Sequence, residues 1–149
     1  MNKAYITLLS SEDYLEAVLV LNYSLRLVNS QYPLIVYITN QVYNNKKIIN
    51  ILSKENIIIE KEIDKYEYCQ DTLNYLKSKT DDYRFNTLKN TSSKIGILDL
   101  KQYDKLCYID ADSIVLKNID DIFNYPSGSM LWDGVQGLST LMVFEPKWY

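Results

Sequence analysis

The stretch "KLCYIDADSIVLKNID", residues 105–120, places Asp110, Ala111 and Asp112 directly after an apolar run that is typical of a buried parallel strand. Ligands of open α/β sheets bind at the carboxyl ends of such strands. Two carboxylates so close together repel one another unless a cation lies between them. The pattern therefore predicts a hard divalent ion, Mg²⁺ or Mn²⁺, that bridges to a substrate diphosphate. The alternative is that Asp112 begins a turn and faces water.

The chain before this stretch alternates between apolar strands and amphipathic helices. Strands are expected at residues 3–9, 34–39 and 56–63, with helices between them at 11–29 and 43–54. This β-α-β-α-β order predicts an α/β fold with a Rossmann-like, mainly parallel sheet that is flanked by helices and joined by right-handed crossovers.

The rest of the chain continues the same alternation less regularly. A helix is expected at 87–101 and the strand at 105–110, followed by a helical turn at 118–123 and strands at 129–134 and 139–145. Residues 64–86 predict only a short helix and a loop. With no repeat, no low-complexity run and no linker, residues 1–149 are expected to form a single domain.

Composition narrows the classes of function. The net charge is −3 and the pI about 5.0, which disfavours nucleic acid as the main partner. No apolar stretch approaches the ~20 residues that cross a bilayer, and no signal peptide is apparent at the first residues. Cys69 and Cys107 lack metal-type spacing, and Cys107 lies in an apolar strand pattern, so we expect a buried free thiol and a cytoplasmic, reducing location.

A longer stretch, "SSKIGILDLKQYDKLCYIDADSIVLKNIDDIF" at residues 92–123, resembles glycosyltransferase family 8, the group that includes glycogenin and galactinol synthases. The likeness lies in the lysine-bearing helix, the Tyr-Asp-Lys turn, the Asp-Ala-Asp (DxD) motif and the Asn-Ile-Asp-x-x-Phe stretch. "AYITLLSSEDYLEAVLVLNYSL" and "STLMVFEP" also resemble the opening strand and helix and a later strand of the family. The resemblance implies a GT-A type fold that binds a nucleotide-diphospho-sugar.

The resemblance also implies roles for residues around the acidic motif. Asp110 and Asp112 would coordinate Mn²⁺ (or Mg²⁺) that bridges the UDP phosphates, and Ala111 would present backbone to the ribose. Lys94, sixteen residues before Asp110, would approach the sugar or phosphate. Arg84 matches a family arginine with looser spacing. A solvated helix residue is the alternative for Lys94.

Residues near the first strand would bind the base. Thr7 and Leu8 would line the uracil pocket, and Tyr14 would stack on the ring. Leu8 as a core residue and Tyr14 as one of many surface tyrosines are the alternatives. The chain has 14 tyrosines, so the residue type alone does not decide.

The sequence departs from the family pattern in two places. The family's third metal ligand is a His in a C-terminal segment, whereas these 149 residues contain no His, so we expect a short form that lacks that segment. The family's Asn-Ser-Gly reads Leu138, Ser139, Thr140 here, and a Leu offers no amide to the donor sugar.

Three functions remain open at this point. The first is metal-dependent transfer of a hexosyl group, glucose or galactose, from a UDP-sugar to a hydroxyl acceptor. The second is a UDP-sugar-binding module with weak or no turnover. The third is a scaffold completed by another chain or by a homodimer. The sequence offers no convincing nucleophile; Asp133 is an acidic residue that we expect in a turn.

Overall fold

A computed structural model describes residues 1–62, 69–82, 85 and 92–146. These residues build one six-stranded sheet in the order β3-β2-β1-β4-β6-β5. The strands are β1 (Lys3–Leu9), β2 (Leu34–Ile38), β3 (Ile58–Lys61), β4 (Lys105–Ile109), β5 (Met130–Trp132) and β6 (Gly137–Phe144). Pairing is parallel from β3 through β4, whereas β6 runs antiparallel to β4 and to β5. The predicted mainly parallel α/β sheet is confirmed.

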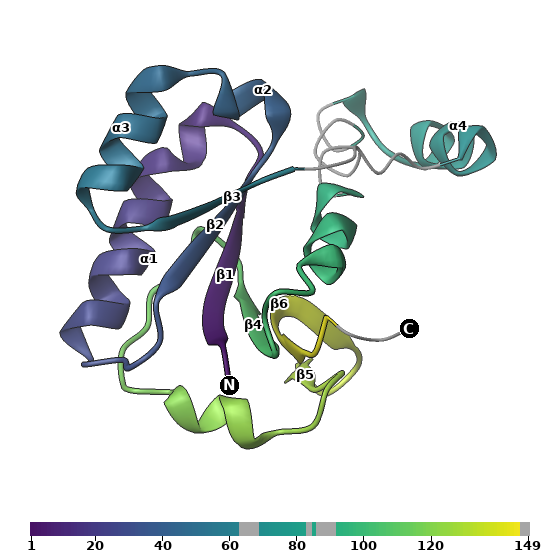
Figure 1. Ribbon diagram of the computed structural model, residues 1–149. Coiled ribbons are helices and arrows are strands. Elements are labelled where there is room, and N and C mark those ends of the chain that lie inside the picture. The colour runs from purple at the N-terminus through teal and green to yellow at the C-terminus, as the bar shows by residue number, and fades with distance from the viewer. Residues whose placement is uncertain (63–68, 83–84, 86–91, 147–149) are drawn as a thin grey trace.

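Helical segments cover both faces of this sheet. The helical segments are η1 (Glu12–Tyr14), α1 (Leu15–Leu27), α2 (Asn40–Tyr43), α3 (Lys46–Lys54), α4 (Gln70–Lys79), η2 (Ser92–Asp99) and η3 (Asp120–Asn124), of which α4 has no buried residue and lies away from the strands in Figure 1. In Figure 1, α1 and α3 lie on one side of the strands and η2, in teal-green, lies on the other. None of the helices in the described part of the chain is long and apolar enough to cross a bilayer.

Two of the expected helices are divided in the structure. The segment expected at 11–29 begins with the 3₁₀ turn η1, where the Ser11 hydroxyl accepts a hydrogen bond from the Asp13 N–H, and continues as α1. The segment expected at 43–54 becomes α2 and α3, because Asn45 takes an extended conformation and its side chain accepts from the Lys47 N–H at 3.0 Å. Only the second break lies at a side-chain N-cap, because Ser11 caps the start of η1 and Tyr14, before α1, makes no capping bond.

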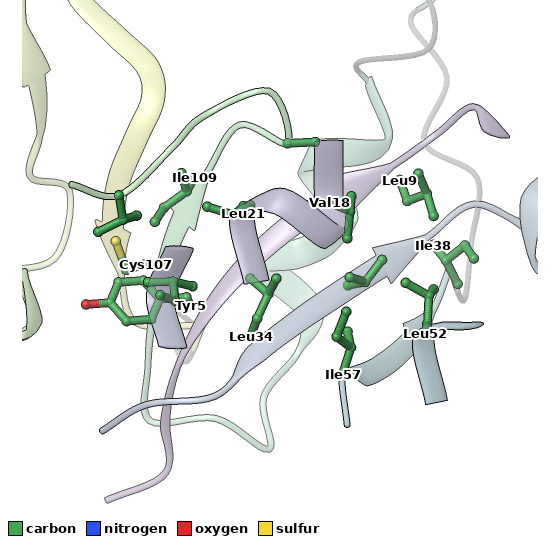
Figure 2. Packing of buried hydrophobic residues seen from close by; sticks show 14 of the residues in the cluster. Tyr5, Leu9, Val18, Leu21, Leu34, Ile38, Leu52, Ile57, Cys107 and Ile109 are labelled. Carbon is green, nitrogen blue, oxygen red and sulfur yellow. The ribbon is translucent and has the colours of Figure 1, made fainter. Parts of the chain in front are cut away.

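The core has two layers, one on each face of the sheet. Alternate residues of β1 divide between them: Tyr5 and Leu9 pack toward α1 and α3, and Ile6 and Leu8 pack toward η2. Figure 2 shows the first layer, with side chains from β1, β2, α1 and α3 directed into it. Full burial of one such large apolar side chain stabilises the fold by about 1.5–3 kcal/mol.

Cys107 belongs to the first layer and is free and fully buried, as expected from its strand pattern. Burial raises the pKa of its thiol to about 12. Cys69 is also free and is exposed. The two cysteines therefore lie in unrelated environments.

Candidate functional site

The acidic motif lies where the sheet reverses its winding direction. From β1 the chain passes to β2 on one side, and β4 later pairs with β1 on the other side. Crevices at such switch points, outside the carboxyl ends of the strands, are the usual ligand sites of open α/β sheets. Asp110 follows the last residue of β4 directly, and its N–H donates to the Thr140 carbonyl of β6 at 3.0 Å. The site is therefore built on the rigid centre of the sheet.

Asp110 is held by two donors from different elements. Lys94 Nζ of η2 lies 2.8 Å from Asp110 Oδ1, and the Tyr108 hydroxyl donates to the same oxygen at 2.9 Å. Lys94 Nζ also lies 4.4 Å from the centroid of the Tyr108 ring, within range of a cation–π interaction. Both contacts fall on Oδ1, and none of the described residues contacts Oδ2.

The Tyr108 hydroxyl is fixed as a hydrogen-bond donor. Burial raises the pKa of this phenol, and the negative charge of Asp110 raises it further. A neutral phenol can therefore donate to the carboxylate throughout the physiological pH range. Tyr108 was not among the candidates from sequence, because its strand pattern indicates only burial.

The two residues after Asp110 differ in exposure. Ala111 is buried in the layer next to α1, whereas Asp112 is exposed. A turn forms here, since the Ser113 N–H donates to the Asp110 carbonyl at 3.1 Å. Burial of the Ala111 methyl group anchors the turn, and the Asp112 carboxylate stays accessible to solvent.

The residues predicted near the first strand occupy three environments. Thr7 is fully buried, and its hydroxyl has no hydrogen-bond partner among the residues that the structure describes. Leu8 lies in the layer next to η2 together with Tyr108, whose hydroxyl bonds to Asp110, so Leu8 and the Asp110 carboxylate lie on the same face of the sheet. Tyr14 ends η1, just beyond the carboxyl end of β1, and 42% of it is exposed. Arg84 lies outside the described residues.

Asp133, the weaker acidic candidate, belongs to the turn between β5 and β6. Its Oδ1 accepts from the N–H groups of Val135 and Gln136, both at 2.8 Å. These backbone donors lower the pKa of its carboxyl. The expectation that Asp133 is a turn residue agrees with this geometry.

The side chains around Asp110 offer some, but not all, of the ligands that a divalent metal needs. Within the described residues no group of three or more His, Cys, Asp or Glu side chains converges. Asp110, through Oδ2, and the exposed Asp112 offer hard oxygen ligands of the kind that Mn²⁺ and Mg²⁺ prefer. Two carboxylates suit a metal whose remaining ligands come from a phosphate-bearing molecule and from water.

The mainly parallel sheet and the acidic turn at its switch point define a class of protein, the open α/β domains that bind a ligand at this edge. A family model described as "Glycosyl transferase family 8" matches residues 5–140. The chain belongs to this family. The resemblance noted at residues 92–123 is thereby confirmed.

The chain is also similar to glycogenins and galactinol synthases, at about 30% sequence identity. Human glycogenin-2 is 31% identical over 123 residues, which cover 83% of this chain and 23% of the relative. Galactinol synthase 7 of Arabidopsis thaliana is 32% identical over 127 residues, and galactinol synthase 1 of Ajuga reptans 33% identical over 127 residues. The chain covers 35% of each of these two synthases. It thus spans roughly a quarter to a third of the length of these relatives.

Solved structures support the fold. The apo form of the glycosyltransferase GlyE of Streptococcus pneumoniae TIGR4 matches with a TM-score of 0.57 at 18% identity, covering 99% of this chain and 35% of that one. A second structure of the same glycosyltransferase gives a TM-score of 0.56 at 17% identity, covering 97% and 34%. The GT-A type fold predicted from sequence is confirmed.

Proposed function

We propose that this chain binds a UDP-sugar through Mn²⁺ (or Mg²⁺) at Asp110 and Asp112, and transfers a hexosyl group, glucose or galactose, to a hydroxyl acceptor. The observation that carries the proposal is the Asp110 carboxylate at the β1/β4 switch point, with Lys94 Nζ 2.8 Å away. A cation beside a partly free carboxylate at this position suits a ligand that brings both phosphate charge and a metal.

The residues divide the work of donor binding. A bound metal would neutralise charge on the departing UDP, as metal ions do in phosphate chemistry. Asp110 and Asp112 hold that metal, and Lys94, fixed by Tyr108 and Asp110, adds a positive charge next to the diphosphate. Ala111 offers backbone to the ribose.

Thr7, Leu8 and Tyr14 are the proposed lining of the uracil pocket. The exposed ring of Tyr14 suits stacking on a base at the carboxyl edge of β1. Arg84 stays a prediction from the resemblance alone. We also propose a cytoplasmic location, which the two free cysteines support.

A second candidate is a UDP-sugar-binding module without turnover. It is favoured by the small ligand set, because two carboxylates and no third converging group in the described residues hold a metal weakly. A scaffold or homodimer is a further form of this candidate. The exposed apolar side chains of β5, Met130, Leu131 and Trp132, support it.

The test is calorimetric titration of UDP and of UDP-glucose with Mn²⁺ or with EDTA. Binding should need Mn²⁺, and Asp110→Asn or Asp112→Asn should weaken it by roughly tenfold or more, since loss of one charged contact costs ~1.5–3 kcal/mol. Asp133→Asn is the matched control: it removes an exposed carboxylate from the β5–β6 turn and should leave the affinity unchanged.

The outcomes separate the candidates. Mn²⁺-dependent binding with release of glucose to water or to an acceptor supports the transferase. The same binding without turnover supports the module. If the wild type binds no UDP with either metal, the donor-site proposal is wrong.

A further inference from the structure

Glu62, directly after β3, carries a carboxylate that is almost completely buried, with 4% of the residue exposed. Its Oε1 accepts a hydrogen bond from the Ser93 hydroxyl at 2.7 Å, and its Oε2 accepts from the N–H of Asn40, the first residue of α2, at 3.2 Å. Its own N–H donates to the Ile38 carbonyl at 2.9 Å. The residue therefore connects three elements at the carboxyl edge of the sheet.

A carboxylate in this position is costly unless its oxygens are satisfied. An apolar residue at position 62 would fill the space without that cost. The bond from Ser93 is short at 2.7 Å and the bond from Asn40 is longer at 3.2 Å. Charge-assisted bonds such as the one from Ser93 are about twice as strong as neutral ones. Glu62 therefore fixes where its partners lie more strictly than apolar packing would.

One of those partners is next to the proposed donor site in sequence and in space. Ser93 precedes Lys94 on η2, and the two side chains reach in different directions. Ser93 reaches Glu62 beside β3, and Lys94 reaches Asp110 after β4. β2 and β1 lie between β3 and β4, so η2 bridges the carboxyl edge of the parallel strands.

The rest of η2 is anchored along its buried face, where Gly96 lies against the Tyr37 hydroxyl. Its buried apolar side chain is Ile97, one 3₁₀ turn after Lys94, while Ile95 and Leu98 are about half exposed. A 3₁₀ helix has poorer hydrogen-bond geometry than an α-helix and is used in short pieces. Rotation of its first turn would move Lys94 away from Asp110, and the Ser93–Glu62 bond opposes that rotation.

We infer that Glu62 and Ser93 are positioning residues of the donor site, which set the place of the Lys94 ammonium against Asp110. One part of this inference, that the placing of Lys94 tightens the binding of a nucleoside diphosphate, rests on the proposed function. Its geometric part, the placing of Lys94, is independent of that function. Both act through Lys94 and not by contact with the donor.

The first measurement needs neither metal nor UDP. The folded protein is treated with an amine-reactive acylating reagent, and the rate of acylation of Lys94 is measured by mass spectrometry. Ser93→Ala should speed this labelling by about threefold or more, because Lys94 then leaves Asp110 more often. Ser93→Thr keeps the hydroxyl and should restore the slow rate. Glu62→Met, which removes both acceptor oxygens, should act as Ser93→Ala does.

Tyr103→Phe is the matched control. The Tyr103 hydroxyl donates to Glu60 on β3 at 2.7 Å, so the variant also removes one hydrogen bond to a carboxylate of the same strand. That bond joins Tyr103 to β3 and involves no residue of η2. Tyr103→Phe should lower the melting temperature in the same way as Ser93→Ala and leave the labelling of Lys94 unchanged.

The second measurement is UDP affinity with Mn²⁺ in a double-mutant cycle. Ser93→Ala should weaken binding roughly tenfold in the wild-type background and not at all when Lys94→Ala is already present. A purely structural role would give the same loss in both backgrounds. Equal losses, or equal effects of Tyr103→Phe and Ser93→Ala on labelling, overturn the inference.

The two proposals fail in different ways. If Ser93→Ala changes neither labelling nor affinity while the wild type binds UDP, the inference is wrong and the donor site stands. If Ser93→Ala exposes Lys94 and the wild type binds no UDP, the placing of Lys94 is supported and the donor role fails together with the proposed function.

Discussion

Asp120, at the start of η3, joins parts of the chain that are far apart in sequence, with Tyr5 115 positions away. Its carboxylate accepts from the Tyr5 hydroxyl at 2.8 Å, the Ser30 hydroxyl at 2.7 Å and the Gln31 N–H at 2.9 Å. Burial raises the pKa of this carboxyl, but the hydrogen bonds, from the Gln31 N–H first, outweigh burial and lower it below its ordinary value. The charged form is therefore the one that the fold stabilises.

Asp120→Ala should lower the free energy of unfolding by about 3 kcal/mol, because it leaves the buried Tyr5 hydroxyl without its acceptor. The pH dependence follows from the sign of the shift. Since the folded-state pKa lies below the unfolded value of about 3.9, the stabilisation is complete above pH ~4 and is lost as pH falls through the folded pKa. Urea unfolding of wild type and variant at several pH values measures both effects.

Asp121→Ala is the control for this prediction, because Asp121 is the exposed neighbour on the same 3₁₀ turn. It should cost less than about 0.5 kcal/mol. An equal loss for the two variants would show that charge at the start of η3, and not the hydrogen bonds of Asp120, stabilises the fold.

The sequence points to some residues of the candidate site and not to others, for a physical reason. Asp110 follows from its place after an apolar strand and Lys94 from the family resemblance, and the structure brings them within 2.8 Å of each other. Glu62 was missed because "IIIEKEI" predicts only a strand end, where a Glu is usually exposed. Its burial depends on Ser93, 31 residues away, and no local pattern shows such a contact.

At the scale of single elements, α3 shows how a short helix is stabilised. It has nine residues, too few to be stable alone, and it rests on its apolar face. Leu52 is fully buried in the core layer between the sheet and helices α1 and α3, whereas Ile51 is 38% exposed. Packing on the sheet, more than intrinsic propensity, therefore maintains the helix.

Leu52→Ala should lower the free energy of unfolding by about 3 kcal/mol, from lost burial and from the cavity that remains. Ile51→Ala removes a side chain of similar size from the next position and should cost less than about 1 kcal/mol. Urea denaturation followed by circular dichroism measures both. Similar losses for the two would mean that helix propensity, and not packing of α3, determines the stability.

The position of each helix was easier to predict from the sequence than its type and its length. The helix expected at 87–101 is described from residue 92 onward as the 3₁₀ helix η2, which ends at Asp99. Gly96 approaches Tyr37 so closely that an added Cβ would collide with the Tyr37 hydroxyl. This approach depends on β2, far away in sequence, so the pattern of η2 alone predicted a longer, ordinary helix.

At the scale of the whole molecule, one sheet belongs to both core layers. β4 contributes Cys107 and Ile109 to the layer next to α1, and Leu106 and Tyr108 to the layer next to η2. The alternation of strands and helices predicted this parallel architecture. The antiparallel place of β6 beside β4 follows from pairing between distant segments, which periodicity does not encode.

Because the layers share their strands, they should not unfold separately, and we propose that residues 1–149 behave as a single domain. Leu52→Ala perturbs the first layer and Leu106→Ala the second, since both side chains are fully buried. Each should shift one common urea transition, with circular dichroism and tyrosine fluorescence coinciding. Two separate transitions, of which each variant moves only one, would mean that β4 does not couple the layers. In that case the switch-point site would lie on a boundary that can open, and donor affinity should fall at urea concentrations below the main transition.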